Sequence, residues 1–225
     1  MSKKLIYFVR HGETELNAKG IKQGVEGALS ARGRAQAADT AQKFPRHQGS
    51  PQIIISSPYP RTRETSEIIA NQLKLNIEYT DLLAERRNPS EVIGRSTKDR
   101  EVEAIVDRIE KSFHDDNFRY SDEENFVDLR DRAKKLLQLI KSRPESRIIM
   151  VTHRAFLKMI LAYMFLDETL DAKIFNKVSY FNPIDNAGLT IVQYTPHWFK
   201  KDEWKLIAQN SNLIEEPPKT QFILE

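Results

Sequence analysis

The residues of this chain with the clearest chemistry are two histidines and two arginines in three short polar segments. Arg10 and His11 open the segment RHGETELN, which ends at Asn17, while Arg61 follows the segment SSPYP and His153 follows the apolar run IIMVT. Guanidinium groups match the oxygens of a phosphate geometrically, and an imidazole can act as nucleophile or hydrogen-bond donor. Together these side chains indicate a cationic site for a phosphate group.

Such a site has the components that phosphoryl transfer needs. The transferring group carries negative charge on three equatorial oxygens, so catalysis consists largely of positioning and electrostatic stabilisation. Arg10 and His11 are neighbours, and neighbouring side chains of an extended strand point to opposite faces of the sheet. We therefore expect Gly12 to allow a sharp turn that brings both side chains to one ligand.

Composition limits the chemistry further. The chain has no cysteine, which excludes disulfides, thiolate ligands and cysteine nucleophiles. It also has no H-E-x-x-H spacing, so we expect neither a metal site nor a cofactor. The net charge of +3 is too small to indicate nucleic-acid binding. The expected partner is a small phosphorylated substrate.

Length and hydropathy favour one cytoplasmic domain. Of the 225 residues, 40% are hydrophobic, and no apolar run approaches the roughly 20 residues of a membrane span. The apolar run at 5–9 is too short for a signal peptide. We expect a domain over residues 1–212 and a C-terminal tail over 213–225, which contains two prolines. The sequence also allows a homodimer through an exposed strand edge.

The elements that position the polar residues alternate between strands and helices. This alternation predicts an α/β fold, a three-layer sandwich with a mostly parallel central sheet flanked by helices. Since ligands of such sheets bind beyond the carboxyl ends of the strands, the polar segments should meet there. Strands are expected at 4–10, 52–56, 76–79, 147–152, 188–194 and 204–208, helices at 31–44, 61–73 and 155–165, and a loop at 82–96.

Two further amphipathic helices are expected between the third and fourth strands. We predict that they form a helical insertion, at about residues 98–141, that covers the sheet. Ser121 and Glu124 have the spacing of a capping box ahead of the second helix. The first apolar stripe contains Val102, Ile105, Val106, Ile109 and Phe113, and the second contains Phe126, Leu129, Ala133, Leu136, Leu137 and Ile140.

Four motifs in order give the chain a family resemblance. The segments FVRHGETELN, LSARGRAQA, SSPYPRTRETSEIIA and VTHRAFLKMIL resemble those of the histidine phosphatase superfamily, which also contains cofactor-dependent phosphoglycerate mutase. The resemblance implies that His11 is the nucleophile that becomes phosphorylated. It also implies that Arg10, Arg61 and His153 form the phosphate pocket and that Asn17 assists by hydrogen bonding.

The resemblance also implies a proton donor for the leaving group. In the family this donor is an acidic residue in a loop after the third strand, which Glu85 of the segment LLAE matches. Glu13 is the rival candidate. The implied activity is metal-independent hydrolysis of a phosphomonoester through a phosphohistidine intermediate.

Two departures from the family pattern bear on the substrate. Family members usually have glycine after the second histidine, where this chain has Arg154, and we hypothesise that Arg154, with Arg86 or Arg87, contacts a second anionic group. The segment ERRNPSEVIGRS differs from the longer tyrosine- and lysine-bearing loop of phosphoglycerate mutases, which favours water as the acceptor. Mutase-type transfer and non-catalytic binding of phosphorylated ligands remain the alternatives.

Overall fold

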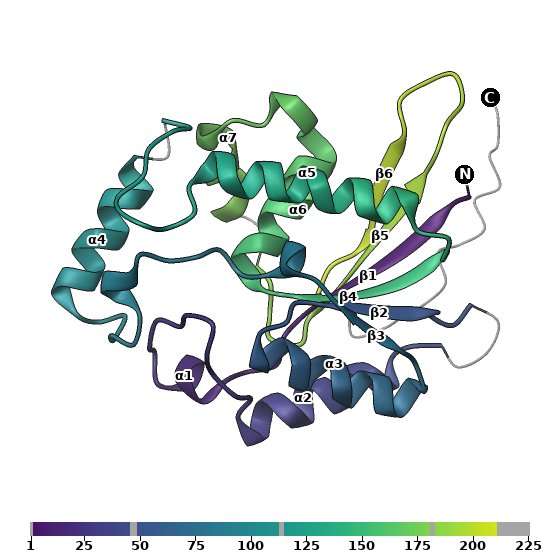
Figure 1. Ribbon diagram of the computed structural model, residues 1–225, viewed down its shortest axis with the longest axis horizontal. Helices are drawn as coiled ribbons and strands as arrows, with labels where there is room; N and C mark the ends of the chain where they lie inside the picture. Colours follow the sequence, from purple (N-terminus) through teal and green to yellow (C-terminus); the bar gives the residue numbers. More distant parts are fainter. Residues whose placement is uncertain (1, 46–48, 113–114, 181–182, 211–225) are drawn as a thin grey trace.

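A six-stranded sheet runs through the centre of the molecule (Figure 1). The computed structural model describes residues 2–45, 49–112, 115–180 and 183–210, so the expected tail at 213–225 and the side chain of Phe113 lie outside the described residues. The strand order is β3-β2-β4-β1-β5-β6. The strands are β1 (Lys4–Arg10), β2 (Ile53–Ser56), β3 (Ile77–Tyr79), β4 (Arg147–Thr152), β5 (Leu189–Thr195) and β6 (Glu203–Ala208).

The register of the parallel strands brings three carboxyl ends to one edge of the sheet. β3, β2, β4 and β1 are parallel, whereas β5 runs antiparallel to both β1 and β6. Arg10 pairs with Thr152, and Ser56 pairs with Val151. The residues that follow β1, β4 and β2 therefore leave the sheet side by side, and the expected mostly parallel sheet is confirmed.

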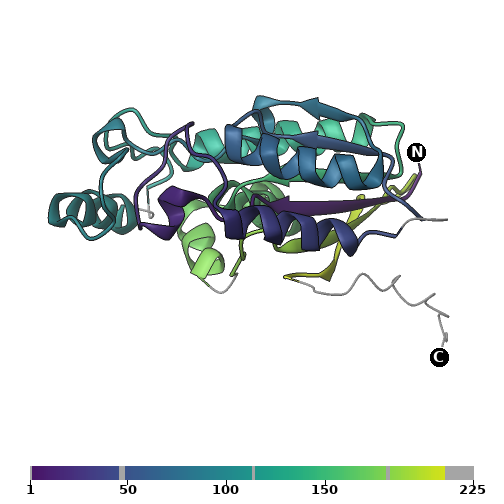
Figure 2. The ribbon, with the colours of Figure 1, turned by 90° about the horizontal axis from the view of Figure 1, so that it is seen from below.

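Helices cover both faces of the sheet, because the buried strands are apolar on both sides. Tyr7 and Val9 of β1 pack on the face covered by α2 (Ala31–Gln42) and α3 (Pro60–Leu73). Ile6 and Phe8 pack on the opposite face, with α5 (Phe126–Ser142) and α6 (Arg154–Leu166). Figure 1 shows the sheet between these two layers, and in Figure 2, seen from below, α2 and α3 lie in front of the sheet. The three-layer architecture is thus confirmed.

Local sequence signals account for the ends of the helices near the site. Ser30 caps α2, because its hydroxyl accepts a hydrogen bond from the Gly33 N–H at 3.0 Å. Pro60 occupies the first turn of α3, where a missing N–H does no harm. Lys74 ends α3 in the left-handed conformation, with φ of 58°.

The two helices expected as an insertion differ in what they cover. α5 buries one face against α6 and the sheet, as expected. α4 (Arg100–Lys111) lies away from the sheet, beside the 3₁₀ turn at Ser90–Val92, and Val102 is its only fully buried residue (Figure 1). The prediction that both helices cover the sheet is therefore wrong for α4.

The capping box ahead of α5 lies one turn later than expected. Asn125 is the N-cap, its side chain accepts from the Asp128 N–H at 3.0 Å, and the Asp128 carboxylate accepts from the Asn125 N–H at 3.1 Å. Ser121 instead donates to Glu91 at 2.9 Å. Asparagine at the N-cap and aspartate three residues later satisfy the N–H groups of these two positions, as serine and glutamate do in the expected Ser121–Glu124 box.

Several short elements had not been expected from the sequence. α1 (Glu15–Ala18) is a single turn, α7 (Ala172–Tyr180) follows α6, and 3₁₀ turns occur at Asp81–Leu83, Ser90–Val92 and Asp167–Thr169. The single turns lack the repeated apolar spacing by which helices are recognised, whereas α7 is a nine-residue helix that the sequence analysis missed. Within the described ranges, no helix is both long and apolar enough to cross a membrane.

Candidate active site

The three strand ends bring His11, Arg61 and His153 into contact. His11 follows β1, His153 follows β4, and Arg61 lies in the first turn of α3 after β2. The ring centroids of the two histidines are 5.2 Å apart, and the Arg61 Nε lies 3.2 Å from the His153 Nδ1. All three side chains are buried, at 4%, 2% and 0% exposure for His11, Arg61 and His153. The sequence prediction that these residues share one site is consistent with this geometry.

The hydrogen bond of His11 fixes its tautomer. The Nδ1 of His11 lies 2.7 Å from the Gly12 carbonyl oxygen. A carbonyl oxygen can only accept, so the neutral ring carries its proton on Nδ1. The Nε2 atom therefore keeps its lone pair, as a nucleophile requires.

His153 has the opposite tautomer. Arg61 Nε can only donate, so the His153 Nδ1 at 3.2 Å must accept. The proton of the neutral ring is then on Nε2, which donates to the Ser57 hydroxyl at 2.9 Å. Ser57 thus orients the second histidine.

Burial and neighbouring cations keep both imidazoles neutral. Desolvation holds the pKa of His11 well below its ordinary value, and the charges of Arg61 and Arg10 lower it further. The pKa of His153 is also far below that value, first because of burial and then because of Arg61. Both rings can therefore act as neutral groups at neutral pH.

Arg61 is held in place by backbone carbonyls. Its Nη1 donates to the carbonyls of Gly24 and Val25, both at 3.0 Å, and its guanidinium lies 5.1 Å from the centroid of the Tyr59 ring. Tyr59 also packs edge-on against His153, at 5.2 Å between centroids. Within the described part of the chain the Arg61 Nη2 has no hydrogen-bond partner, so it is available to a ligand.

Arg10 has donor groups that a phosphate could satisfy. Its Nη1 donates to the Ile184 carbonyl at 2.8 Å, but its buried Nε has no partner among the described residues. Burial lowers the pKa of Arg10 to about 10, although the Glu85 charge raises it. A buried donor without an acceptor is costly, and an anion in the site would supply one.

Gly12 is required for a different reason from the one expected. It does not have a positive φ, but a Cβ at this position would lie 2.4 Å from the carbonyl oxygen of Gly33 in α2. A Cβ at Gly33 would in turn lie 2.0 Å from the Glu13 carbonyl oxygen. Close backbone packing, and not a left-handed turn, accounts for these two glycines.

Asn17 forms part of the cap of α1. Its backbone N–H donates to the Thr14 hydroxyl at 3.0 Å, and its Oδ1 accepts from the Thr14 N–H at 3.4 Å. Within the described ranges the Asn17 Nδ2 has no partner. Its expected contact with phosphate stays a prediction that would use this amide group.

The two candidate acids lie in different surroundings. The Glu85 carboxylate accepts hydrogen bonds from the N–H groups of Ala155 and Phe156, at 3.3 and 3.0 Å, in the first turn of α6. Its charge also acts on both Arg10 and Arg61. The Glu13 carboxylate instead accepts from the Ser30 hydroxyl at 2.9 Å, at the start of α2. This geometry favours Glu85.

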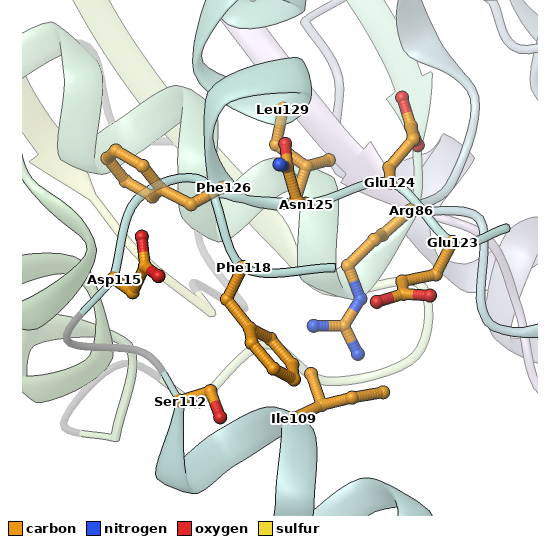
Figure 3. A pocket seen from close by; sticks show the side chains of 10 residues that line it. All are labelled: Arg86, Ile109, Ser112, Asp115, Phe118, Glu123, Glu124, Asn125, Phe126 and Leu129. Atoms are coloured by element: carbon orange, nitrogen blue, oxygen red, sulfur yellow. The ribbon is translucent and has the colours of Figure 1, made fainter. Parts of the chain in front are cut away.

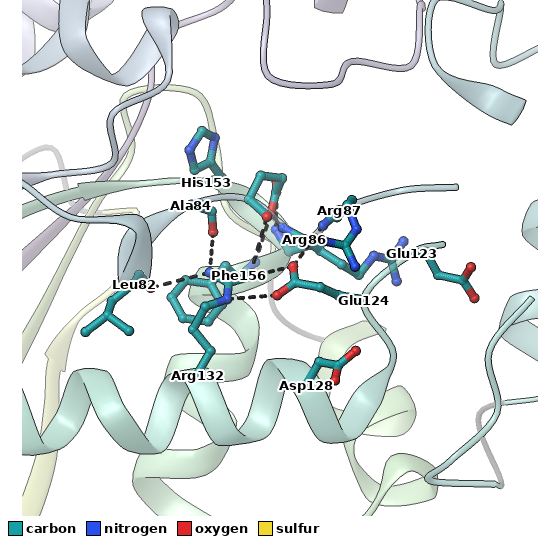
Figure 4. A network of polar contacts seen from close by, with 12 residues as sticks. Leu82, Ala84, Arg86, Arg87, Glu123, Glu124, Asp128, Arg132, His153 and Phe156 are labelled. Carbon is teal, nitrogen blue, oxygen red and sulfur yellow. Dashed lines mark hydrogen bonds and ion pairs between the residues drawn. The ribbon is translucent and has the colours of Figure 1, made fainter. Parts of the chain in front are cut away.

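An ion pair that the sequence analysis missed holds the Glu85 segment (Figure 4). Arg132 of α5 donates through Nε and Nη2 to the two oxygens of Glu124, at 3.0 and 2.8 Å. Its Nη1 donates to the Ala84 carbonyl at 2.6 Å, and its guanidinium lies over Phe156. The one sequence signal for this role is that an arginine, Arg132, lies among the apolar positions of α5.

The three arginines proposed to contact a second anionic group are separated by the fold. Arg86 and Arg154 line one cavity beside the site. Arg87 instead donates to the Asp122 carbonyl at 2.6 Å. Figure 3 shows the Arg86 side chain reaching toward Phe118 and toward Ile109 of α4. Arg86, and not Arg87, is thus the arginine that lies with Arg154.

Sequence comparison relates this fold and site to known proteins. The family model described as "Histidine phosphatase superfamily (branch 1)" matches residues 6–207. The rat protein 6-phosphofructo-2-kinase/fructose-2,6-bisphosphatase 1 is 29% identical over 168 residues, which are 74% of this chain and 33% of that protein. The match therefore spans about a third of that relative.

Solved structures share the whole fold. A mycobacterial glucosyl-3-phosphoglycerate phosphatase, in complex with VO3, aligns with a TM-score of 0.74 and 23% identity over 92% of this chain and 99% of that chain. A phosphoserine phosphatase mutant from Entamoeba histolytica, in complex with phosphoserine, gives a TM-score of 0.72 and 22% identity over 93% and 98% of the two chains. At these identities the likeness concerns the fold.

Proposed function

The chain belongs to the histidine phosphatase superfamily, and from this we propose that it hydrolyses a small phosphorylated metabolite through phosphorylation of His11. One observation carries the proposal. The neutral His11 ring has its proton on Nδ1, held by the Gly12 carbonyl, and this leaves the Nε2 lone pair free beside two arginines. A histidine that only ended the strand would need neither a proton held on Nδ1 nor arginines beside its Nε2.

In the first proposed step the His11 Nε2 attacks phosphorus in line with the ester oxygen. The N–P bond forms as the P–O bond breaks, and the leaving oxygen takes a proton from the carboxylic acid of Glu85 to become an alcohol. Arg10 and Arg61 stabilise the charge on the equatorial oxygens, and His153 assists as a neutral donor once its Nε2–H turns from Ser57 to the phosphate.

In the second step water attacks the phosphohistidine. The Glu85 carboxylate accepts a proton from this water, the N–P bond breaks, and inorganic phosphate leaves with His11 restored. The segment after Glu85 is short in comparison with the mutase loop, which supports water as the acceptor. The N–H groups of Ala155 and Phe156 hold the Glu85 side chain in position beside His153.

A phosphatase screen of the purified chain tests the proposal. We expect phosphate release from at least one phosphomonoester in the presence of a chelator, because the proposed charge stabilisation comes from side chains. The variant His11→Ala should lose at least about 10³-fold in kcat, and brief acid quenching of wild type with ³²P-labelled substrate should trap a phosphohistidine.

The control is Arg87→Gln, which alters a nearby arginine outside the proposed site. The proposal fails if His11→Ala keeps wild-type turnover, or if activity disappears with the chelator and returns with a metal. Incubation with 3-phosphoglycerate and a trace of 2,3-bisphosphoglycerate separates the mutase alternative, which would yield 2-phosphoglycerate in place of free phosphate. Binding of phosphorylated compounds without any turnover would favour the non-catalytic alternative.

A further inference from the structure

A second cavity lies beside the proposed phosphate pocket. It has a volume of about 440 Å³ and is bounded by the segment after α1, the segment after Glu85, and helices α4, α6 and α7. The residues of this cavity on which the argument depends are Lys22, Arg86, Glu110, Arg154, Lys158 and Ala155. No step of the proposed mechanism uses its cationic side chains.

The charges around this cavity are unbalanced. Four cationic side chains line it, and Glu110 is the one carboxylate of the lining. Within the described part of the chain, none of these four side chains forms an ion pair with a carboxylate. Lys158 donates to the Ser179 carbonyl and Arg86 to Asn88, but neither contact neutralises a charge.

Gathering like charges on a partly buried surface costs free energy that a bound anion would remove. Burial lowers the pKa of Lys22, and the neighbouring Arg86 charge lowers it further, against the opposing effect of Glu110. The pKa of Lys158 is lowered in the same way, first by burial and then by Arg154 and Arg10. Each lysine of the cavity is thus close enough to an arginine of the cavity for their charges to repel one another.

The cavity adjoins the proposed catalytic pocket. Arg154 directly follows His153, and its charge acts on Arg10 of the phosphate pocket. Ala155 lines the cavity, and its N–H donates to Glu85. A ligand of a few bonds' length with its phosphate beside His11 can therefore extend into the cavity.

We propose that the cavity formed by Lys22, Arg86, Arg154 and Lys158 binds a second anionic group of the substrate. The substrate class is then a small metabolite that carries one phosphomonoester and, a few bonds away, a carboxylate or a second phosphate. This inference rests on the proposed function for the placement of the first phosphate. Arg154 is central to it, because its side chain lines the cavity and its charge also acts on Arg10 of the phosphate pocket.

Binding to a protein that cannot turn over tests this specificity. We would measure Kd by calorimetry in the His11→Ala protein for two matched pairs: 3-phosphoglycerate against glycerol 3-phosphate, and glucose 1,6-bisphosphate against glucose 6-phosphate. The second anion should tighten binding by about tenfold or more in at least one pair. The pair that responds identifies the anion as carboxylate or phosphate.

Variants then locate the effect. Arg154→Gln and Lys22→Gln, each combined with His11→Ala, should reduce this preference by about tenfold, whereas Arg87→Gln should leave it intact. The inference is overturned if neither pair shows a preference for the compound with the second anion. It is also overturned if neither variant reduces that preference, or if Arg87→Gln reduces it equally. Phosphate release by wild type is assayed separately, so a failed specificity test is distinguishable from an absent phosphatase activity. Circular dichroism confirms that each variant is folded.

Discussion

At the scale of single residues, the proposed chemistry depends on which nitrogen of each histidine carries the proton. The acceptor at the His11 Nδ1 is a carbonyl and the donor at the His153 Nδ1 is a guanidinium. These partners assign opposite tautomers to two rings whose centroids are only 5.2 Å apart. One ring is therefore equipped to attack and the other to donate.

The His11 ring should stay neutral below the ordinary imidazole pKa. Its pKa is lowered by burial and by Arg61 and Arg10, so the fraction of neutral ring should be unchanged as the pH falls from 8 to 6. An ¹⁵N-detected NMR titration of ring-labelled free enzyme would measure this, with His11→Gln used for assignment. A titration midpoint at or above about 6.5, or a proton on Nε2, would contradict the assignment.

At the scale of elements, two close contacts fix the site. The first is between the segment after β1 and the start of α2, where Gly12 and Gly33 leave no room for a Cβ. The second is between α5 and the Glu85 segment, where Arg132 donates to Glu124 and to the Ala84 carbonyl. Each contact joins parts of the chain that are distant in sequence.

Gly33→Ala should destabilise the protein although alanine favours helices. The new Cβ would lie 2.0 Å from the Glu13 carbonyl oxygen, and overpacking of this kind costs about 1–3 kcal/mol. Urea unfolding would measure the change in the free energy of unfolding. The matched control is Ala35→Gly at an exposed position of α2, where glycine costs about 0.5–1 kcal/mol. Wild-type stability of Gly33→Ala would show that α2 can move away from β1.

Glu124→Gln should destabilise the chain more than loss of a surface pair does. The Arg132 and Glu124 side chains are only 14% and 16% exposed, and removing one charge leaves the other partly buried without its partner. We expect a loss of about 1–3 kcal/mol in the free energy of unfolding and a lower kcat. The control is Asp107→Asn, whose ion pair with Lys111 is exposed to solvent and should therefore contribute little to stability. Equal effects in both variants would refute this supporting role.

At the scale of the whole molecule, the two histidines lie where both layers of the sandwich meet the sheet edge. His11 contacts the α2 and α3 side through Gly12, whose N–H donates to Thr65, while His153 caps α6 on the other side. Burying two neutral imidazoles links folding to pH. The cytoplasmic location and the homodimer remain predictions, and sedimentation velocity would test the latter.

Stability of the ligand-free protein should fall as the pH drops below about 6.5. Both folded-state pKa values are lowered, so below that pH the unfolded chain binds protons that the folded chain does not. The stabilisation that comes from the lowered histidine pKa values is complete above the pKa of the unfolded chain. It is lost on acidification, by up to about 1.4 kcal/mol per histidine and pH unit. Urea unfolding at pH 5.0–7.5 measures the slope, and His11→Gln with His153→Gln should flatten it. An equal slope in that double variant would assign the effect to other groups.

The strands, most of the helices that flank them and the residues that gather at the sheet edge could be predicted from the sequence. Local patterns sufficed, because apolar runs fix the strands and the three polar segments follow directly from their carboxyl ends. Arg10, His11, Arg61 and His153 could be named for that reason, and Glu85 and Asn17 through the family resemblance. Their catalytic roles stay predictions.

The support of these residues comes from the folded structure and could not be predicted. The tautomers depend on Gly12, Ser57 and Arg61, and the need for Gly12 depends on Gly33. The choice of Arg86 over Arg87 depends on which of them lines a cavity with Arg154. The placement of α4 away from the sheet was equally unforeseen. All of these follow from contacts between segments distant in sequence, whose geometry no local pattern of residues encodes.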